Sequence, residues 1–395
     1  MRIKRRKTLS IFYIIFSIFF STKINSQISK IPVYISGREG HDTYRIPAII
    51  KAPNRHLLAF AEGRAANGGD FGDINIVLKR SINQGKNWSK LKIIVNNDSL
   101  QVGNPAPVVD YNDPKFPNGR IFLFYNTGNN HENEVRKGNG MREVWYKTSV
   151  DNGLNWSAAV NITGQVHRPN QPLFNRQYTF KDDWRSYANT PGHALQIQNG
   201  KYKGRIFVPA NHSAGSPKAD FTDYVSHGFY TDDHGKTFKL SPNLEIDGSN
   251  EATATEISSN RLMLNARNQK GNIKARIVAI SADGGASWEK TYFDKNLPDP
   301  VCEGSILTIG KRNGKNVLAF SNAADSLNRD NLTLRISVDD GKTWKISKLI
   351  EQNKSKKDID FTAYSDLVKI NSNTVGILYE RNDYKEIVYT AVKWE

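Results

Sequence analysis

The chain has 395 residues, of which 38% are hydrophobic and 10% aromatic, so it can form a core and is not disordered by composition. Its formal net charge is +16, but the Lys and Arg residues are spread along the chain rather than clustered. This distribution argues against a nucleic-acid-binding surface, whereas the positive charge favours an anionic substrate. The single cysteine, Cys302, excludes an internal disulfide, and we expect it to be a buried small apolar residue.

Residues 1–27 have the pattern of a secretory signal peptide. Basic residues run from Arg2 to Lys7, and the apolar run from Leu9 to Phe20 is too short to span a membrane comfortably. Ser26 offers a cleavage site, and the alternative is an uncleaved N-terminal anchor. We expect residues 28–395 to be secreted or periplasmic, without stable membrane insertion after cleavage.

Strand patterns begin at Ile31–Ser36 and continue at Tyr44–Ile50, where Arg45 interrupts an otherwise apolar strand. Pro47 lacks an N–H group and indicates a strand end or a sheet edge at that point. An arginine with apolar neighbours favours a functional role for Arg45. The alternative is a surface arginine at the start of a strand.

Two further strands, Leu57–Glu62 and Ile74–Arg80, flank a glycine-rich loop over Ala65–Gly72 that contains Asp70. A mobile loop that carries a lone carboxylate is a suitable place for a general acid. An ordinary turn aspartate is the alternative interpretation of Asp70. Residues 161–192 form the longest stretch without a clear strand pattern, and long loops of this kind are usually functional or disordered.

A short turn motif recurs five times along the chain. Each copy reads Ser/Thr-x-Asp/Asn-x-Gly-x-Thr/Ser/Asn-Trp/Phe, and the copies are Ser81–Trp88, Ser149–Trp156, Thr231–Phe238, Ser281–Trp288 and Ser337–Trp344. Their starts lie 50 to 82 residues apart, without helical patterns between them, which predicts propeller blades built from antiparallel strands. We expect the Asp or Asn to accept backbone N–H bonds, the aromatic residue to pack between strands of one blade, and no copy to contact a ligand.

The other sequence features indicate a single domain without a metal site. There is no low-complexity segment, linker or second domain, so we expect one domain over residues 28–395. No group of Cys and His residues has metal-ligand spacing. Among the eight histidines, only His193 and His212 are candidates for a pocket.

Several motifs resemble those of the bacterial-type exo-sialidases (neuraminidases), in the family's order and over nearly all of the chain after residue 27. They are Tyr44–Pro47, Phe60–Arg64, the Asp70 loop, the five repeat turns (Asp boxes), Asn250–Glu251, Leu264–Arg267, Arg329, Ala363–Leu367 and Leu378–Glu380. The resemblance implies an all-β, six-bladed β-propeller in which one blade lacks a recognisable Asp box. Asn83 replaces the usual Asp in the first copy, which affects only a structural turn.

The resemblance also implies a cationic clamp for the substrate. Sialic acid carries a carboxylate on its anomeric carbon, and a guanidinium can bind a carboxylate through two parallel hydrogen bonds. The implied substrate-binding residues are Arg45, Arg64, Arg267 and Arg329, with Glu380 as the acid that braces Arg45. Arg335 lies close to Arg329 on the same segment and is the alternative third clamp arginine.

An Asp or Glu nucleophile would meet like charge at that anomeric carbon, and sialidases use a tyrosine instead. Tyr364 matches this tyrosine, and Glu251 matches the base that a phenol needs in order to react. Asp70 matches the acid/base that protonates the leaving oxygen and then activates water, a role that requires a raised pKa. The resemblance implies no metal and no cofactor.

The function implied by the resemblance is that of a secreted exo-α-sialidase, and we expect a monomer. It would release terminal sialic acid from glycoproteins, glycolipids and oligosaccharides by retaining hydrolysis. A trans-sialidase or an anhydro-forming sialidase would use the same core residues and differ on the acceptor side of the pocket. A non-catalytic glycan-binding propeller would be expected to have lost Asp70, Glu251 or Tyr364, and all three are present.

Overall fold

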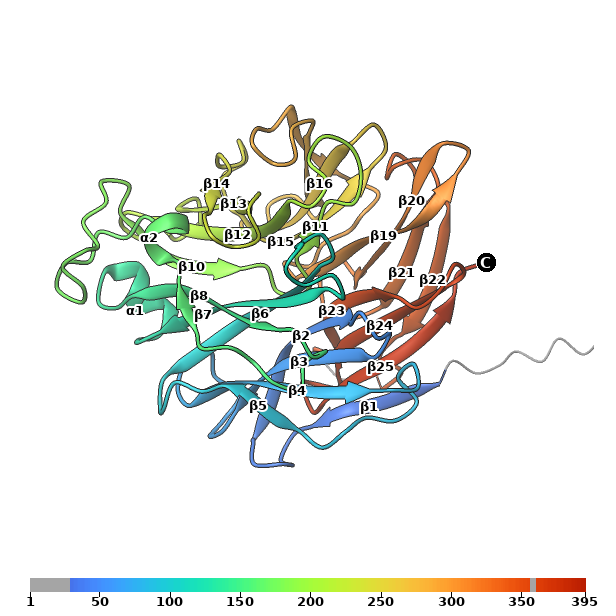
Figure 1. Ribbon diagram of the computed structural model, residues 1–395, viewed down its shortest axis with the longest axis horizontal. Coiled ribbons are helices and arrows are strands. Elements are labelled where there is room, and N and C mark those ends of the chain that lie inside the picture. The colour runs from blue at the N-terminus through green and yellow to red at the C-terminus, as the bar shows by residue number, and fades with distance from the viewer. Residues whose placement is uncertain (1–28, 356–359) are drawn as a thin grey trace, which may run out of the picture.

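The computed structural model of the chain describes residues 29–355 and 360–395 (Figure 1). The signal peptide predicted over residues 1–27 lies outside this part of the chain. Nearly every described element is an antiparallel strand, which confirms the predicted all-β class. The helices of the described ranges are α1 (Glu132–Lys137) and α2 (Thr163–Val166). Neither approaches the length and apolarity of a membrane-spanning helix.

Four of the sheets are separate units of four or five strands. The first has the order β1-β25-β24-β23, with β1 (Lys30–Ile35), β23 (Thr362–Lys369), β24 (Thr374–Arg381) and β25 (Glu386–Lys393). The second contains β10 (Trp184–Asn189), β11 (Leu195–Gln196), β12 (Ile206–Ala214), β13 (Tyr224–Thr231) and β14 (Lys239–Leu240). The third contains β15 (Ser249–Ile257), β16 (Arg261–Asn268), β17 (Arg276–Ser281) and β18 (Lys290–Asp294). The fourth contains β19 (Gly304–Arg312), β20 (Lys315–Ala323), β21 (Leu332–Ser337) and β22 (Ile346–Glu351).

The remaining sheet, called the double sheet here, has eight strands in two antiparallel halves. One half contains β2 (Thr43–Lys51), β3 (Leu57–Arg64), β4 (Ile74–Ser81) and β5 (Lys92–Val95). The other contains β6 (Gln101–Asp110), β7 (Arg120–Gly128), β8 (Arg142–Ser149) and β9 (Val160–Asn161). The family resemblance implies six separate blades, and the structure instead has four separate sheets and this double one. The halves are continuous because Ile74 of β4 and Gln101 of β6 form a single parallel pair.

The sheets follow one another around a central axis, from the N-terminus to the C-terminus (Figure 1). The ring closes because β1, from the start of the chain, pairs with β25 at its end, with Lys30 opposite Thr390 and Ile35 opposite Glu386. The first strands of successive units contact each other, for example β15 with β19 and β23 with β2. This radial arrangement confirms the predicted β-propeller.

Hydrophobic clusters fill the space between neighbouring units rather than one central core. In the double sheet, Phe60 and Leu78 of one half pack with Leu123 of the other. Phe124 of β7 meets Phe229 of β13 edge-on, with ring centroids 5.6 Å apart. Because the neighbouring units cover both faces of each sheet, its inner strands are buried along most of their length, and β3 is buried at every position.

The five Asp-box turns have the hydrogen bonds that the sequence predicts. In the last copy, Asp339 Oδ1 accepts the backbone N–H of Thr343 at 2.9 Å and the hydroxyl of Ser337 at 2.7 Å. Gly341 donates its N–H to the Ser337 hydroxyl at 2.8 Å, and its φ of 79° lies in the left-handed region that suits glycine. Asn83 in the first copy keeps the corresponding bonds through its amide oxygen.

The aromatic residues of the Asp boxes pack within their own unit, as predicted, and also against the neighbouring unit. Trp344 and Phe238 meet Phe320 and Phe229 of their own sheets, with ring centroids 5.9 Å apart in both pairs. Trp156 follows β8 and meets Phe60 of β3 edge-on, with ring centroids 6.0 Å apart. Trp88 follows β4 and meets Tyr389 of β25 in the same way at 5.5 Å. The boxes therefore also join units to one another. All five lie in the described ranges, and none lines the polar cavity of the propeller.

Candidate active site

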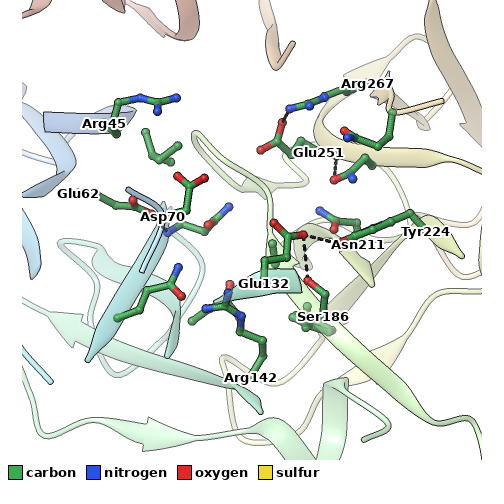
Figure 2. Close-up of a pocket in the computed structure, with 18 of the residues that line it drawn as sticks. Arg45, Glu62, Asp70, Glu132, Arg142, Ser186, Asn211, Tyr224, Glu251 and Arg267 are labelled. Atoms are coloured by element: carbon green, nitrogen blue, oxygen red, sulfur yellow. Dashed lines mark hydrogen bonds and ion pairs between the residues drawn. The ribbon is translucent and has the colours of Figure 1, made fainter. Parts of the chain in front are cut away.

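A cavity of about 270 Å³ opens where the first strands of the units converge (Figure 2). Each of the four separate sheets and both halves of the double sheet contribute residues to its lining. Arg45, Arg267 and Glu251 lie toward one end of the cavity, whereas Glu132 and Arg142 lie toward the other. The lining is dominated by arginines, carboxylates and amides, so the cavity suits a polar, charged ligand.

Irregularities in the first strands position the side chains of this site. Register shifts in β2, β15 and β23 fall at or next to Arg45, Glu251 and Tyr364. Bulges of this kind re-aim side chains and are frequent beside active sites. Ile46 has a φ of 57°, a conformation that strains a β-branched residue, and Pro47 follows it within β2.

The three predicted clamp arginines line one end of the cavity. Arg45 lies in β2, Arg267 in β16, and Arg329 in the connection between β20 and β21. The guanidinium of Arg45 lies 3.8 Å from the centre of the Tyr384 ring, and Arg329 donates to the Tyr384 hydroxyl at 3.1 Å. Arg335 bonds within its own sheet and does not line the cavity, so Arg329 is the third arginine that the structure brings to this site.

Glu380 is fully buried and connects β2 to the strand of Tyr364. Its Oε1 accepts the Nε–H of Arg45 at 2.8 Å and the backbone N–H of Ile46 at 2.9 Å. Its Oε2 accepts the backbone N–H of Tyr364 at 3.1 Å. A buried carboxylate needs such compensation, and Arg45 supplies the opposite charge. Glu380 therefore holds both an arginine of the clamp and the tyrosine's backbone in place.

Tyr364, Glu251 and Arg267 form a closed hydrogen-bonded triangle. The Tyr364 hydroxyl donates to the Glu251 carboxylate, with O···O distances of 2.6 and 2.8 Å. Arg267 Nη1 donates to the Tyr364 oxygen at 2.9 Å and to Glu251 Oε2 at 2.7 Å. Burial and the Glu251 carboxylate raise the pKa of Tyr364, and the cations Arg267 and Arg329 offset this only in part. The phenol is therefore protonated at neutral pH, and its proton already faces an acceptor.

Asp70 lies on the loop between β3 and β4, at the open side of the cavity. Its side chain is 73% exposed, and its Oδ1 pairs with Arg64 Nη1 at 2.8 Å. Partial desolvation by the surrounding protein raises the pKa of Asp70, but the nearby charges of Arg64, Arg45 and Arg142 lower it by more, so the pKa lies below its usual value. The acid role predicted for Asp70 requires a raised pKa, whereas the arginines around this carboxylate lower it, so that role stays a prediction.

Arg64 lines the cavity, but protein partners engage most of its guanidinium. Its Nε and Nη2 donate to Glu62 Oε2 at 3.2 and 2.8 Å. Its Nη1 donates to the carbonyl of Gly68 at 2.6 Å and also pairs with Asp70. Arg64 therefore orders the loop that carries Asp70, and direct contact with a substrate stays a prediction.

No sequence motif marks the polar wall at the other end of the cavity, which Glu132, Arg142, Ser186 and Tyr224 form (Figure 2). The hydroxyls of Tyr224 and Ser186 both donate to Glu132 Oε1, the second at 3.2 Å. Glu132 begins α1, in the connection between β7 and β8. Arg142 begins β8 and, by strand alternation, shares a face with buried Val144. A charged residue on an apolar strand face is the same sequence feature that drew attention to Arg45 in β2.

The two histidines proposed for a pocket do not line this cavity, so that prediction is wrong. His193 pairs with the buried carboxylate of Asp366 at 2.6 Å. His212 stacks on Trp184, with ring centroids 3.5 Å apart. Cys302 is fully buried in a small apolar cluster, as predicted, and burial raises the pKa of its thiol to about 12.

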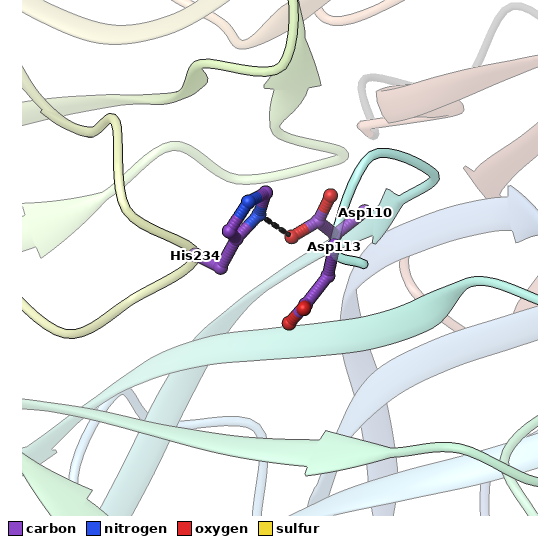
Figure 3. Close-up of side chains that lie close together, drawn as sticks. All are labelled: Asp110, Asp113 and His234. Atoms are coloured by element: carbon purple, nitrogen blue, oxygen red, sulfur yellow. Dashed lines mark hydrogen bonds and ion pairs between the residues drawn. The ribbon is translucent and has the colours of Figure 1, made fainter. Parts of the chain in front are cut away.

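A second polar cluster, Asp110, Asp113 and His234, lies outside this lining (Figure 3). Its oxygen and nitrogen atoms lie within 4.8 Å of one another, although the sequence spacing gives no sign of a metal site. Protein partners already engage them, since His234 Nδ1 bonds Asp110 Oδ2 at 2.8 Å and Arg120 pairs with Asp113 at 2.6 Å. The cluster connects the double sheet to the Asp-box turn after β13.

Comparison with known proteins places the chain in a family. The BNR repeat-like domain model matches residues 55–379. A sialidase of Micromonospora viridifaciens is 30% identical over 370 residues, which cover 88% of this chain and 51% of that protein. The chain therefore spans about half the length of this relative.

Solved structures agree with this relationship. The Hadza microbial sialidase Hz136 is 26% identical, with a TM-score of 0.74 over 91% of this chain and 67% of that one. A leech intramolecular trans-sialidase shares the fold, with 16% identity and a TM-score of 0.69 over 91% of this chain and 70% of that one. With its five Asp boxes and its family match, the chain belongs to the BNR repeat-like domain family, among the bacterial-type sialidases.

Proposed function

We propose that the chain is an exo-α-sialidase, a glycoside hydrolase that releases terminal sialic acid from glycoproteins, glycolipids and oligosaccharides. The observation that carries this proposal is the triangle of Tyr364, Glu251 and Arg267, which shares one cavity with Arg45 and Arg329. A tyrosine paired with a carboxylate suits attack on an anomeric carbon that itself bears a carboxylate. Three arginines at the same end of the cavity suit that carboxylate.

In this proposal the substrate carboxylate accepts hydrogen bonds from Arg45, Arg267 and Arg329. Among the described residues, Arg45 bonds Glu380 through Nε alone, which leaves both terminal nitrogens for a ligand. Arg267 and Arg329 are held by Glu251 and Tyr384. Because these partners fix the guanidinium groups in advance, little side-chain entropy is lost when the carboxylate binds.

The reaction then proceeds through a covalent intermediate. The Tyr364 oxygen attacks the anomeric carbon and transfers its proton to Glu251, while the bond to the leaving oxygen breaks and that oxygen takes a proton from Asp70. In the second step Asp70 accepts a proton from water, the water oxygen bonds the anomeric carbon, and the departing Tyr364 oxygen regains its proton from Glu251. Two displacements at one carbon give net retention. Arg267 donates to the phenol oxygen throughout and stabilises negative charge that develops there.

Asp70 must be protonated to act as the acid, and its pKa in the structure lies below its usual value. A substrate carboxylate held on Arg45 would cancel part of the positive field around Asp70. The sugar would also cover a side chain that is 73% exposed. Both effects raise the pKa of a carboxyl group. A positioned general acid of this kind contributes about 10²- to 10⁴-fold to a rate.

We further propose that the double sheet represents two blades, which gives the propeller six. The support is the hydrophobic cluster between its halves, which matches the clusters between the other units. We also propose that residues 1–27 are removed on export and that residues 28–395 act as a monomeric catalytic domain, secreted or periplasmic. Mass measurement of the exported protein and analytical ultracentrifugation test these two points.

The test of the proposed activity is incubation of the purified protein with an aryl sialoside, followed by proton NMR. We expect free sialic acid, appearing first as the α-anomer. Transfer to an added sugar, or an anhydro product, would instead indicate a trans-sialidase or an anhydro-forming sialidase. Binding without release of sialic acid from any sialoside would identify a non-catalytic glycan-binding propeller and overturn the proposal.

A further inference from the structure

Arg142 differs from the other arginines of the cavity in lacking a protein partner. All five of the others have a carboxylate within ion-pair distance: Arg45 with Glu380, Arg64 with Glu62, Arg136 with Asp223, Arg267 with Glu251 and Arg329 with Asp360. Arg329 bonds the Tyr384 hydroxyl. The Arg142 guanidinium has no hydrogen bond or ion pair among residues 29–355 and 360–395, although the residue is only 5% exposed and lines the cavity.

The fold makes a specific place for this side chain. Gly128 of β7 lies opposite Arg142 of β8, and a Cβ atom on Gly128 would stand 2.0 Å from Arg142 Nη1. Any other residue at position 128 would therefore push the guanidinium away. Burial lowers the pKa of Arg142, and the charge of Glu132 offsets this only in part. A buried cation without a partner is costly, so its retention at a cavity wall points to a ligand that supplies the missing acceptors.

The groups beside Arg142 indicate what this ligand offers. Gln101 Oε1 is buried without a hydrogen-bond partner, and Gln101 also lines the cavity. Within the described residues, the protein hydrogen bonds of Glu132 involve Oε1, which leaves Oε2 as an acceptor. The wall therefore combines guanidinium donors with carboxylate and amide acceptors. A neutral group that both accepts and donates hydrogen bonds fits this combination, whereas an anion would be repelled by Glu132.

We propose that Arg142 is a specificity-determining residue that binds oxygen acceptors on the sialic acid substituents farthest from the sugar's carboxylate. This inference rests on the proposed function, because a carboxylate held at Arg45 and Arg267 directs the other end of the sugar toward Arg142 (Figure 2). Two substituents there carry suitable oxygens, namely the acylamino group on C5 and the three-hydroxyl chain on C6. Both present the same chemistry, and their separate contributions can be measured.

The test compares Arg142→Met, Arg142→Lys and Gly128→Ala with the wild type. The substrates are aryl sialosides with a 5-acetamido, 5-glycolylamido or 5-hydroxyl group, and one whose C6 chain has been shortened by mild periodate cleavage followed by borohydride reduction of the resulting aldehyde. Arg142→Met should lose roughly tenfold to a hundredfold in kcat/KM on the full substrate, mainly through KM, as expected for a charge-assisted bond. Arg142→Lys should recover part of this loss. Gly128→Ala keeps the charge but displaces the guanidinium, so its loss in kcat/KM should fall between those of Arg142→Lys and Arg142→Met.

The substrate series separates recognition from structural damage. The loss in Arg142→Met should largely disappear with the substrate that lacks the contacted group, either the 5-acylamino group or the full C6 chain. An equal loss on every substrate overturns the proposal. Lys137→Ala removes a positive charge from α1, outside the cavity lining, and should leave kcat/KM unchanged. Thermal melts establish that each variant is folded.

Failure of the proposed function can be recognised separately. If the wild type turns over none of these substrates, calorimetric binding of free sialic acid and of the matching free sugars makes the same comparison without catalysis. Weaker binding by Arg142→Met, restored toward wild type for the sugar that lacks the contacted group, supports the role of Arg142. Binding that is equal in wild type and variant, or absent from both, overturns it.

Discussion

The carboxylates of the Asp-box turns and those of the cavity differ in how far along the sequence their hydrogen-bond partners lie. In the last box, Asp339 bonds Ser337 and Thr343, two and four positions away. In the cavity, Glu251 bonds a tyrosine 113 positions away, and Glu380 bonds Arg45 across 335 positions. The turns can form locally, whereas the cavity exists only once the ring has closed. Changes in the turns should therefore alter stability, and changes in the cavity should alter activity.

The largest expected effect is that of Tyr364→Phe, which removes the proposed nucleophile and keeps the arginines. Its kcat should fall by more than the about 10²- to 10⁴-fold expected for loss of a general base. Glu251→Gln, which keeps the shape of the base, should fall within that range. Steady-state kinetics and calorimetric binding of the substrate test this, and binding should persist in Tyr364→Phe. If Tyr364→Phe or Glu251→Gln retained most of its turnover, the claim that changes in the cavity alter activity would be contradicted.

The next effect is that of Arg45→Ala, which should cost about 3–5 kcal/mol in kcat/KM because charge-assisted bonds are strong in a closed site. An analogue that lacks the substrate carboxylate should lose little further activity in this variant. If the two losses simply add, Arg45 is not the partner of that carboxylate. The double variant Arg45→Ala/Glu380→Gln shows how much of the loss comes from leaving the buried Glu380 without its cation.

Asp339→Ala should have the opposite profile. It removes the acceptor of three hydrogen bonds in one turn, which should lower the free energy of unfolding by about 1–2 kcal/mol. Asp339→Asn is the matched control and should lose less, because Asn83 already serves in the first box. Urea denaturation and kcat/KM are measured together. Lost activity with unchanged stability would show that an Asp box contributes to the site.

The smallest effect on activity should come from histidines behind the cavity wall, where His167 and His227 pack on Tyr187. Burial lowers the pKa of His167 and His212 well below its usual value and that of His227 to about 3. The unfolded chain binds protons near pH 6.5 that the folded chain does not bind. Stability should therefore be full above pH 6.5 and decrease below it, by about 1.4 kcal/mol per pH unit for each such histidine.

Replacing His227 with Gln should remove one histidine's share of this slope. Denaturation at pH 7, 6 and 5 measures the slope in the wild type and in the variant. Activity at neutral pH should change little, because these rings do not line the cavity. An unchanged slope in the variant would mean that His227 is protonated in the folded chain.

The local parts of the fold are the parts that the sequence predicts well. The Asp-box pattern contains its own hydrogen-bond partners, so five turns and the propeller follow from it. Continuity between β4 and β6 depends on the single pair of Ile74 and Gln101, which no local pattern reveals. Residues 161–192, which show no clear strand pattern in the sequence, contain α2 and β10. Within this stretch only positions 186–188 line the cavity.

The site is predictable only where a motif marks it. Tyr364, Glu251 and Arg267 were identified by resemblance, because their mutual contacts cross more than one unit of the propeller. The lowered pKa of Asp70 depends on the folded positions of several arginines and cannot be derived from residue spacing. Arg142 lies in no recognised motif, and the only sequence feature that marks it is its position as a charged residue on the buried face of a strand.

Identification of the residue that becomes covalently attached to the sugar tests the central claim most directly. The protein is incubated with a fluorinated sialic acid that slows the second step, digested, and analysed by mass spectrometry. The account predicts a single glycosyl adduct on Tyr364, an adduct that disappears in Tyr364→Phe. A label on Glu251 or on any other residue, or a first hydrolysis product of β configuration, would contradict it.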